Sequence, residues 1–183
     1  MSHAERIAAE LAAVAETMPP GSMEALADAI LSAKHVFIAG AGRSGLMMRA
    51  MAMRLMHLGL KVCVVGEVVT PGIMPGDLLL VGSGSGTTAS LVAAAEKAKK
   101  VGADVALITI DATSAIASMA TDILTIPVPS PKARQQGHVN SAQPMGSLFE
   151  QSLLLVGDSL IMLLMQRLEM DSDTMFQRHA NLE

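Results

Sequence analysis

Six consecutive residues combine glycines with side-chain hydroxyls just after the apolar run 77–81 and Gly82. They are Ser83, Gly84, Ser85, Gly86, Thr87 and Thr88. Glycine allows successive main-chain N–H groups to face one point, and a helix starting near Thr88 would add a partial positive charge of roughly half a unit. Hydroxyls supply further donors that can rotate toward phosphate oxygens. The stretch therefore predicts a cradle for a phosphate group.

The predicted phosphate belongs to a small molecule and not to a nucleotide triphosphate. The sequence contains no G-x-x-x-x-G-K-[ST] pattern, which is the loop that holds triphosphates. A flexible capped turn is the simpler alternative, but it would explain only some of the six residues. We therefore favour a phosphomonoester site.

A second glycine-rich stretch, "GAGRSG" at 40–45, lies between a predicted strand and a predicted helix. It satisfies G-x-G-x-x-G, and Glu67 follows the next strand where an acid could bind a ribose, so a dinucleotide site is the main competing hypothesis. That hypothesis leaves the 83–88 stretch unexplained, and 183 residues leave no second domain to bring a substrate to a nicotinamide. A purely structural alternative is a tight turn with Ser44 as N-cap and Arg43 exposed.

Three further polar residues have both a chemical and a structural interpretation. The spacing of Ser147 and Glu150 is typical of a capping box, and taken alone it favours that role. Arg54 lies among apolar neighbours, where pairing with a carboxylate at a subunit contact is the simplest explanation. His179 lies in a polar tail and would by composition be an ordinary surface histidine.

The elements that would position these residues alternate between strands and helices. Almost continuously apolar runs predict five strands buried on both faces, at 35–39, 61–65, 77–81, 104–110 and 122–128. Helices are predicted between them, for example at 46–58 and 90–101. The pattern predicts an α/β fold, a three-layer sandwich with a five-stranded parallel, flavodoxin-like doubly wound sheet. Ligands of such sheets lie beyond the carboxyl ends of the strands, where both glycine-rich stretches fall.

Composition and charge narrow the function classes. Hydrophobic residues make up 51% of the chain and charged residues 16%, so self-association is expected, with 47–56 and 153–168 as candidate interface helices. The net charge is −4 and no segment forms a basic stripe, so nucleic acid is not an expected partner. The N-terminal stretch predicts an amphipathic helix and not a signal peptide, and no membrane span is expected. A single cysteine, Cys63, fits the cytoplasm and an inert place in the core.

Several motifs together resemble one family. They are "GAGRSG", "AMRLMHLG", "VVGE", "SGSGTT", "QPMGSLFEQ" and the terminal "RHANLE", which occur in the family's order over about 40–183. The chain resembles the sugar isomerase (SIS) domain family and, within it, the 6-phospho-3-hexuloisomerases. The resemblance implies one SIS domain over 1–183, with N-terminal helices in 1–33 and a tail at 170–183 that reaches an active site.

The family resemblance also implies an activity and its residues. The reaction is the isomerisation of hex-3-ulose 6-phosphate to fructose 6-phosphate, coupled in the family to hexulose phosphate synthase and formaldehyde fixation, with no metal or organic cofactor. Glu150 would move the carbon-bound proton and His179 would assist, in its own or a neighbouring subunit of a tetramer. The phosphate would lie on Ser44 and 83–88, and Arg43 would also bind the substrate. The family often has an acid where this chain has Thr87.

Three alternatives stay open at this point. A sugar-phosphate sensor would need the hydroxyl-rich loop, residues 83–88, but not Glu150. An isomerase of another sugar phosphate would need both the loop and Glu150. A dinucleotide-dependent oxidoreductase would use "GAGRSG" and Glu67 instead. The linker 127–146, with four prolines, is too long for a tight connection and is predicted to be a lid or a binding segment.

Overall fold

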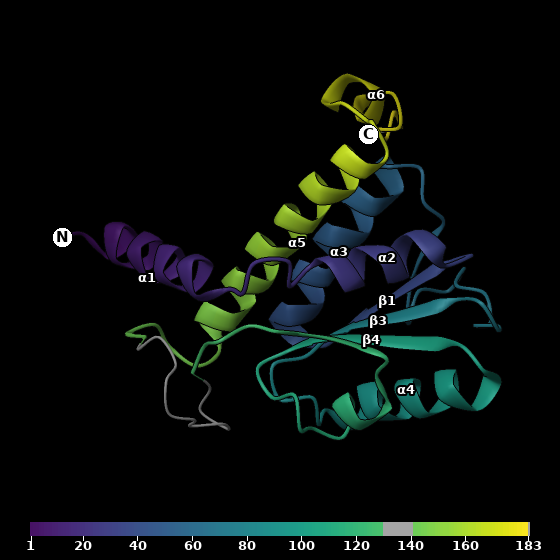
Figure 1. The fold of residues 1–183 in the computed structure, drawn as a ribbon, viewed down its shortest axis with the longest axis horizontal. Coiled ribbons are helices and arrows are strands. Elements are labelled where there is room, and N and C mark those ends of the chain that lie inside the picture. The colour runs from purple at the N-terminus through teal and green to yellow at the C-terminus, as the bar shows by residue number, and fades with distance from the viewer. Residues whose placement is uncertain (130–140, 183) are drawn as a thin grey trace.

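Five parallel strands form one sheet in the order β2-β1-β3-β4-β5 (Figure 1). We analysed a computed structural model, which describes residues 1–129 and 141–182. The strands are β1 (Val36–Gly40), β2 (Val62–Val64), β3 (Leu78–Gly82), β4 (Asp104–Thr109) and β5 (Asp122–Thr125). The order reverses between β1 and β3, as in flavodoxin-like sheets. The predicted fold class is confirmed.

Helices cover both faces of this sheet. Figure 1 shows α4 on one face and α2, α3 and α5 on the other. The helices are α1 (His3–Thr17), α2 (Glu24–Ser32), α3 (Gly42–His57), α4 (Ala89–Val101), α5 (Ser147–Arg167) and α6 (Ser172–Phe176), with a 3-10 turn η1 (Ala117–Met119). The longest helix, α5, packs mainly on α3, and α1 lies beside the first half of α5.

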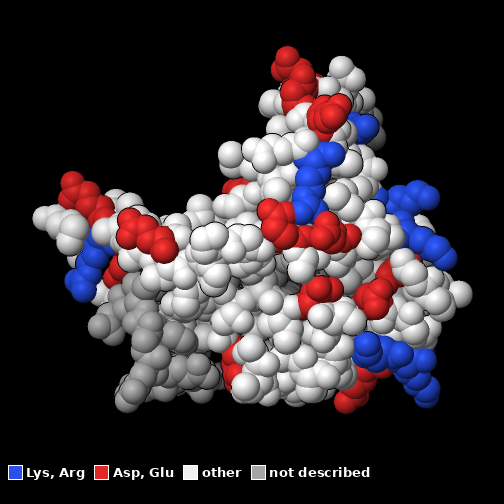
Figure 2. All heavy atoms as spheres, in the orientation of Figure 1, with Lys and Arg blue, Asp and Glu red and all other residues white. Residues whose placement is uncertain are grey.

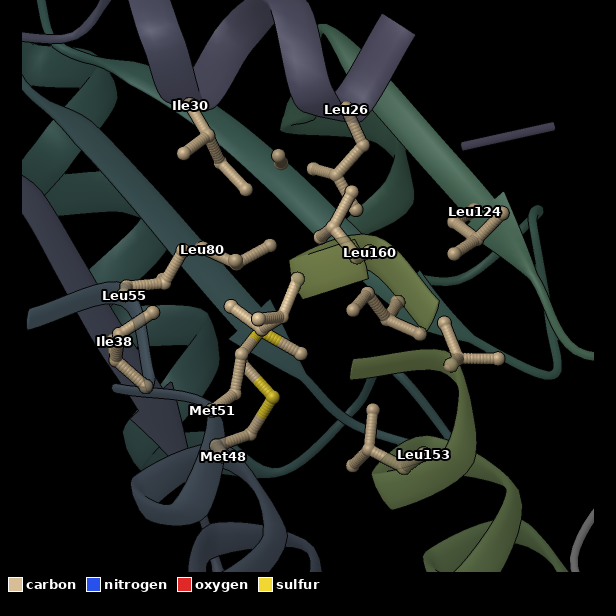
Figure 3. Packing of buried hydrophobic residues seen from close by; sticks show 14 of the residues in the cluster. Leu26, Ile30, Ile38, Met48, Met51, Leu55, Leu80, Leu124, Leu153 and Leu160 are labelled. Carbon is tan, nitrogen blue, oxygen red and sulfur yellow. The ribbon is translucent and has the colours of Figure 1, made fainter. Parts of the chain in front are cut away.

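The apolar strands are buried on both faces, which is why their sequences lack a polar alternation. Ile38, Leu80 and Ile108 face the layer of α2, α3 and α5, and Figure 3 shows several side chains of this cluster. Their neighbours along the strands, such as Val81 and Leu107, face α4 instead. Alternate residues of each strand therefore belong to two separate cores, one on each side of the sheet.

Some element boundaries differ from the predicted ones. Helix α3 begins at Gly42, four residues before the predicted start, because the first turn of a helix needs no internal N–H partner and so tolerates glycine. Strand β5 ends at Thr125, short of the predicted 128, where Pro127 lacks the N–H that a ladder requires. Cys63 lies in β2 and packs against the α4-side core, and burial raises the pKa of its thiol.

The surface carries few charges and several large apolar side chains. In Figure 2 acidic and basic residues are interspersed and large areas of the visible face are uncharged. Exposed apolar side chains include Leu46, Met53, Met56, Val68, Val69 and Met162. Among the described residues one helix, α5, is long and apolar enough to cross a membrane. Half of its apolar stretch is buried inside the protein, as in the core helix of a globular domain.

Candidate active site

A pocket of about 300 Å³ opens at the carboxyl ends of the central strands, between the loop after β3 and the start of α5. Its polar lining consists of Ser44, Ser83, Ser85, Thr88 and Glu150. Its apolar lining includes Ala41, Leu91, Ile110, Met145 and Phe149. Three segments that lie far apart in the sequence, at Ser44, at 83–88 and at Glu150, therefore contribute the hydroxyls and the carboxylate of a single cavity.

The loop after β3 is held by contacts within the protein. The Ser83 hydroxyl is buried and accepts a hydrogen bond from the Gly86 N–H at 3.2 Å. Thr109 Oγ1 donates to the Gly84 carbonyl at 3.1 Å. Gly86 has a φ of 59°, and a Cβ on it would lie 2.5 Å from the Cβ of Ser114. Only glycine therefore fits at this turn, and the loop has one defined shape.

Several main-chain donors of this loop remain available to a ligand. Within the described residues, the N–H groups of Gly84, Ser85 and Thr88 donate to no protein acceptor. The Ser85 hydroxyl accepts from Thr87, from its N–H at 3.4 Å and from its Oγ1 at 3.2 Å. Thr87 itself is exposed, and it supports Ser85 from outside the pocket.

Three helices begin at the pocket, which makes its field favourable for an anion. The residues preceding their first turns are Ala41 before α3, Thr88 before α4 and Gly146 before α5, and all three line the cavity. Each helix N-terminus carries a partial positive charge of roughly +0.5. Converging N–H groups and dipoles of this kind bind phosphate without needing a lysine.

Glu150 lies in the first turn of α5 and pairs with Arg43 across the pocket. The donor is Arg43 Nε and the acceptor is Glu150 Oε2. The Glu150 side chain is 18% exposed and that of Arg43 is 61% exposed. The capping box is wrong, because Ser147 is already helical, Gly146 is the N-cap, and the carboxylate bonds Arg43. Ser44 as N-cap is wrong for the same reason, since Ala41 holds that position.

The glycines of "GAGRSG" serve the packing of β1 against α3. A Cβ on Gly40 would lie 2.8 Å from the Cα of Gly45, so the strand and the helix approach too closely for any side chain there. Glu67, the acid of the dinucleotide hypothesis, forms an ion pair of 2.5 Å with Arg49 of α3. The motif is therefore explained by the close packing of β1 against α3 next to the pocket.

Comparison with known proteins then decides the family. The model of the SIS domain matches residues 29–155, which include β1 to β5, the hydroxyl-rich loop and the start of α5. The chain belongs to the SIS domain family.

Several of its relatives carry the same name. A 3-hexulose-6-phosphate isomerase of Bacillus subtilis is 52% identical over 158 residues, 86% of this chain and 85% of the relative. A 3-hexulose-6-phosphate isomerase of Mycobacterium gastri is 45% identical over 95% of this chain and 86% of the relative. A Methanococcus jannaschii protein, whose crystal structure infers a 3-hexulose-6-phosphate isomerase function, has a TM-score of 0.86 at 32% identity, covering 100% of both chains.

The SIS domain brings most of the predicted site residues together. Ser44, Ser83, Gly84, Ser85, Thr88 and Glu150 line the pocket. Arg43 reaches it through Glu150, Gly86 shapes the loop from behind, and Thr87 lies outside. The linker 127–146 is described only in part: residues 130–140 lie outside the described residues, while Met145 and Gly146 line the pocket.

His179 lies away from this pocket, beyond the far end of α5. Its ring stacks on His57 at a centroid distance of 5.5 Å and on Phe176 at 5.7 Å. It lines a second cavity together with Arg54 and Asp158. Arg54 Nη1 lies 3.2 Å from the Nδ1 of the buried His57. Burial, and then Arg54 and His179, lower the pKa of His57.

The apolar walls of the pocket are the residues that sequence reasoning missed. Phe149 and Ile110 pack over Gly84, each within 3.3 Å of where its Cβ would be. Phe149 is adjacent in sequence to Glu150, so a buried aromatic beside a predicted catalytic acid was an available signal. Ile110 directly follows β4, and in the sequence it is only the last apolar residue of the predicted strand 104–110.

Proposed function

We propose that this protein isomerises hex-3-ulose 6-phosphate, in its D-arabino form, to fructose 6-phosphate through an enediol. The observation that carries the proposal is the single pocket that combines a phosphate cradle with the carboxylate of Glu150. The relatives named 3-hexulose-6-phosphate isomerase, at 45–52% identity over most of the chain, support the same reaction.

The reaction moves a carbonyl from C3 to C2 and needs one base that acts on carbon. Glu150 removes the proton from C2, the electron pair of that bond forms the C2=C3 double bond, and O3 takes up a proton. O2 then loses its proton as the C2 carbonyl forms, and Glu150 returns its proton to C3. A positioned acid–base group of this kind typically contributes about 10² to 10⁴ in rate.

The phosphate is bound by the loop after β3 and by the helix N-termini. The donors are the N–H groups of Gly84, Ser85 and Thr88 together with the hydroxyls of Ser44, Ser83 and Ser85. Arg43 provides a positive charge next to Glu150, close to where the enediol oxygens form. The reaction involves no net redox change, because C2 is oxidised as C3 is reduced, and we assign no cofactor or metal to this chain.

His179 is assigned to the site of a neighbouring subunit. The 21 residues of α5 span roughly 30 Å and separate it from Glu150 of its own chain. The exposed apolar side chains of α3, of α5 and of the loop after β2 support an oligomer, which we propose to be a tetramer. The whole chain then acts as one SIS domain, a soluble cytoplasmic enzyme that receives its substrate from a hexulose phosphate synthase.

An assay in heavy water tests the proposal. The protein is incubated with hex-3-ulose 6-phosphate, fructose 6-phosphate is measured by a coupled enzyme, and deuterium uptake into substrate and product is followed by NMR. Turnover together with exchange is expected. Binding without exchange would support a sensor, and conversion of a different ketose or aldose phosphate alone would overturn the substrate. Titration with a nicotinamide dinucleotide tests the alternative of a dinucleotide-dependent oxidoreductase, which would require binding of that cofactor.

A further inference from the structure

A buried glutamate of the N-terminal helix contacts the segment that leads into the pocket. Glu10 lies on α1 and is 9% exposed. Its carboxylate accepts hydrogen bonds from Ser141 Oγ at 2.7 Å, from the Ala142 N–H at 3.0 Å and from Gln143 Nε2 at 3.0 Å. We call these four residues the Glu10 clamp. Its three donors come from consecutive residues more than 130 positions away in the sequence.

The sequence marks Glu10 as unusual. The apolar face of α1 carries Ile7, Leu11 and Val14, and Glu10 falls on that face at helical spacing. A carboxylate buried at such a position is unfavourable unless donors surround it. An apolar side chain would suffice if the position only had to pack α1 against α5.

The carboxylate is held in its ionised form by the clamp. The hydrogen bond from the Ala142 N–H is the main cause that lowers the pKa of Glu10, and the Ser141 and Gln143 bonds act in the same direction against the effect of burial. The only ion-pair partner in the described part of the chain is Arg6, 3.7 Å away and 58% exposed. The negative charge of Glu10 is therefore stabilised mainly by uncharged hydrogen-bond donors of the segment 141–143.

The clamp ends two residues before the pocket wall. Gln143 is followed by Pro144, and then by Met145 and Gly146, which line the cavity. Met145 has a φ of 54°, a left-handed conformation that is unfavourable for residues other than glycine and persists where both flanks are fixed. On one flank the first turn of α5 is fixed by the buried Leu148 and Phe149. The Glu10 clamp fixes the other flank.

We propose that Glu10 is a positioning residue for the substrate pocket: by clamping 141–143 it places the wall formed by Met145 and Gly146. The expected effect on KM rests on the proposed function, whereas the effect on the structure of 141–146 does not. Glu150 stays anchored by α5 itself, so the clamp affects substrate binding more than proton transfer.

The test compares Glu10→Gln with Glu16→Gln, the same change at an exposed position of the same helix. The amide that Glu10→Gln introduces brings two donors toward a site that holds donors already, so the clamp opens. We expect KM for hex-3-ulose 6-phosphate to rise about threefold to tenfold with kcat within twofold, and Glu16→Gln to match the parent protein. Gln143→Ala, which removes one donor and leaves the charge bound by two others, should raise KM by less.

Hydrogen exchange of the 141–149 peptide provides a second readout that needs no substrate. Faster exchange is expected in Glu10→Gln and Gln143→Ala, and unchanged exchange in Glu16→Gln. If the folded variants keep the parent KM and exchange rate, the proposal is overturned, and if Glu10→Gln does not fold, Gln143→Ala decides. A parent protein that does not turn over the sugar contradicts the proposed function alone, because the exchange result still tests the clamp.

Discussion

Arg43 and Glu150 join the first turn of α3 to the first turn of α5 across the mouth of the pocket. The ion pair aligns the carboxylate that we assign as the base with the helix that follows β1. An exposed ion pair contributes about 0.2–1 kcal/mol to stability. The value of this contact therefore lies in orientation and local charge.

Replacing Arg43 by methionine is expected to lower kcat about tenfold, roughly 1.4 kcal/mol in activation free energy, because Glu150 loses its orienting donor. Steady-state kinetics measures the effect on kcat, and urea unfolding measures the separate effect on stability. Arg49→Met is the matched control, since Arg49 lies on the same helix, is 52% exposed and is paired with Glu67. Equal kcat values for the two variants would contradict a special role of Arg43.

Glu150→Gln is expected to lower turnover by about 10² to 10⁴, because the amide cannot accept a proton from carbon. Phosphate binding should persist, since the donors of the cradle are unchanged. Kinetics and calorimetric titration with the sugar phosphate check both statements. Glu96→Gln, at an exposed position of α4, serves as the control. Near-normal turnover in Glu150→Gln would remove Glu150 from the mechanism.

Gly86→Ala is expected to weaken substrate binding and to destabilise the fold. The left-handed backbone costs a residue with a Cβ about 1–2 kcal/mol, and the new methyl group overlaps Ser114, so the loop must move. We expect KM to rise at least tenfold. Gly21→Ala has a similar φ of 73° and more space, and it should show the backbone cost without the effect on KM.

His179 and Glu150 can be separated by mixing subunits. His179→Ala is expected to reduce turnover, and so is Glu150→Gln. If each site takes its histidine from a neighbour, oligomers reassembled from both variants contain some sites with both native residues, and activity returns on mixing. Activity measured after joint and after separate refolding provides the comparison. A mixture that stays as inactive as its components would place both residues on one chain or exclude His179.

The pH dependence of stability is expected to reveal His57. Arg54 can only donate, so Nδ1 of His57 must accept, and burial first of all keeps the pKa of His57 below the unfolded value of about 6.5. Below pH 6.5 His57 becomes protonated in the unfolded chain but stays neutral in the folded chain. The contribution of His57 to the free energy of unfolding is therefore at its maximum above that pH, and it decreases as the pH drops toward the folded pKa. His57→Gln should flatten this part of the curve, and His3→Gln should not.

The fold could be predicted because its signals are local. Continuous apolar strands such as 77–81 specify a parallel sheet covered on both faces, and the site was expected at the carboxyl ends of the strands, where the two glycine-rich stretches lie. That Ser83, Ser85 and Thr88 line the pocket followed from that rule and from residue type.

The contacts across the pocket could not be predicted in the same way. The pairing of Arg43 with Glu150, and of Glu10 with residues 141–143, joins segments more than a hundred residues apart. The capping-box pattern compares only residues that are close in sequence, so taken alone it predicts a hydrogen bond between Glu150 and the backbone of Ser147. Likewise, the position of His179 depends on how α5 directs the tail, and the sequence of the tail does not encode that direction.

In the proposed site the phosphate is bound largely by main-chain amides, and a substitution leaves these N–H donors in place unless it introduces proline. The carboxylate of Glu150 has no such protection, because one codon change removes it. A duplicated copy of this gene could therefore lose chemistry in a single step and keep its affinity for the sugar phosphate. A receptor for the same metabolite is therefore a single substitution away from the proposed site.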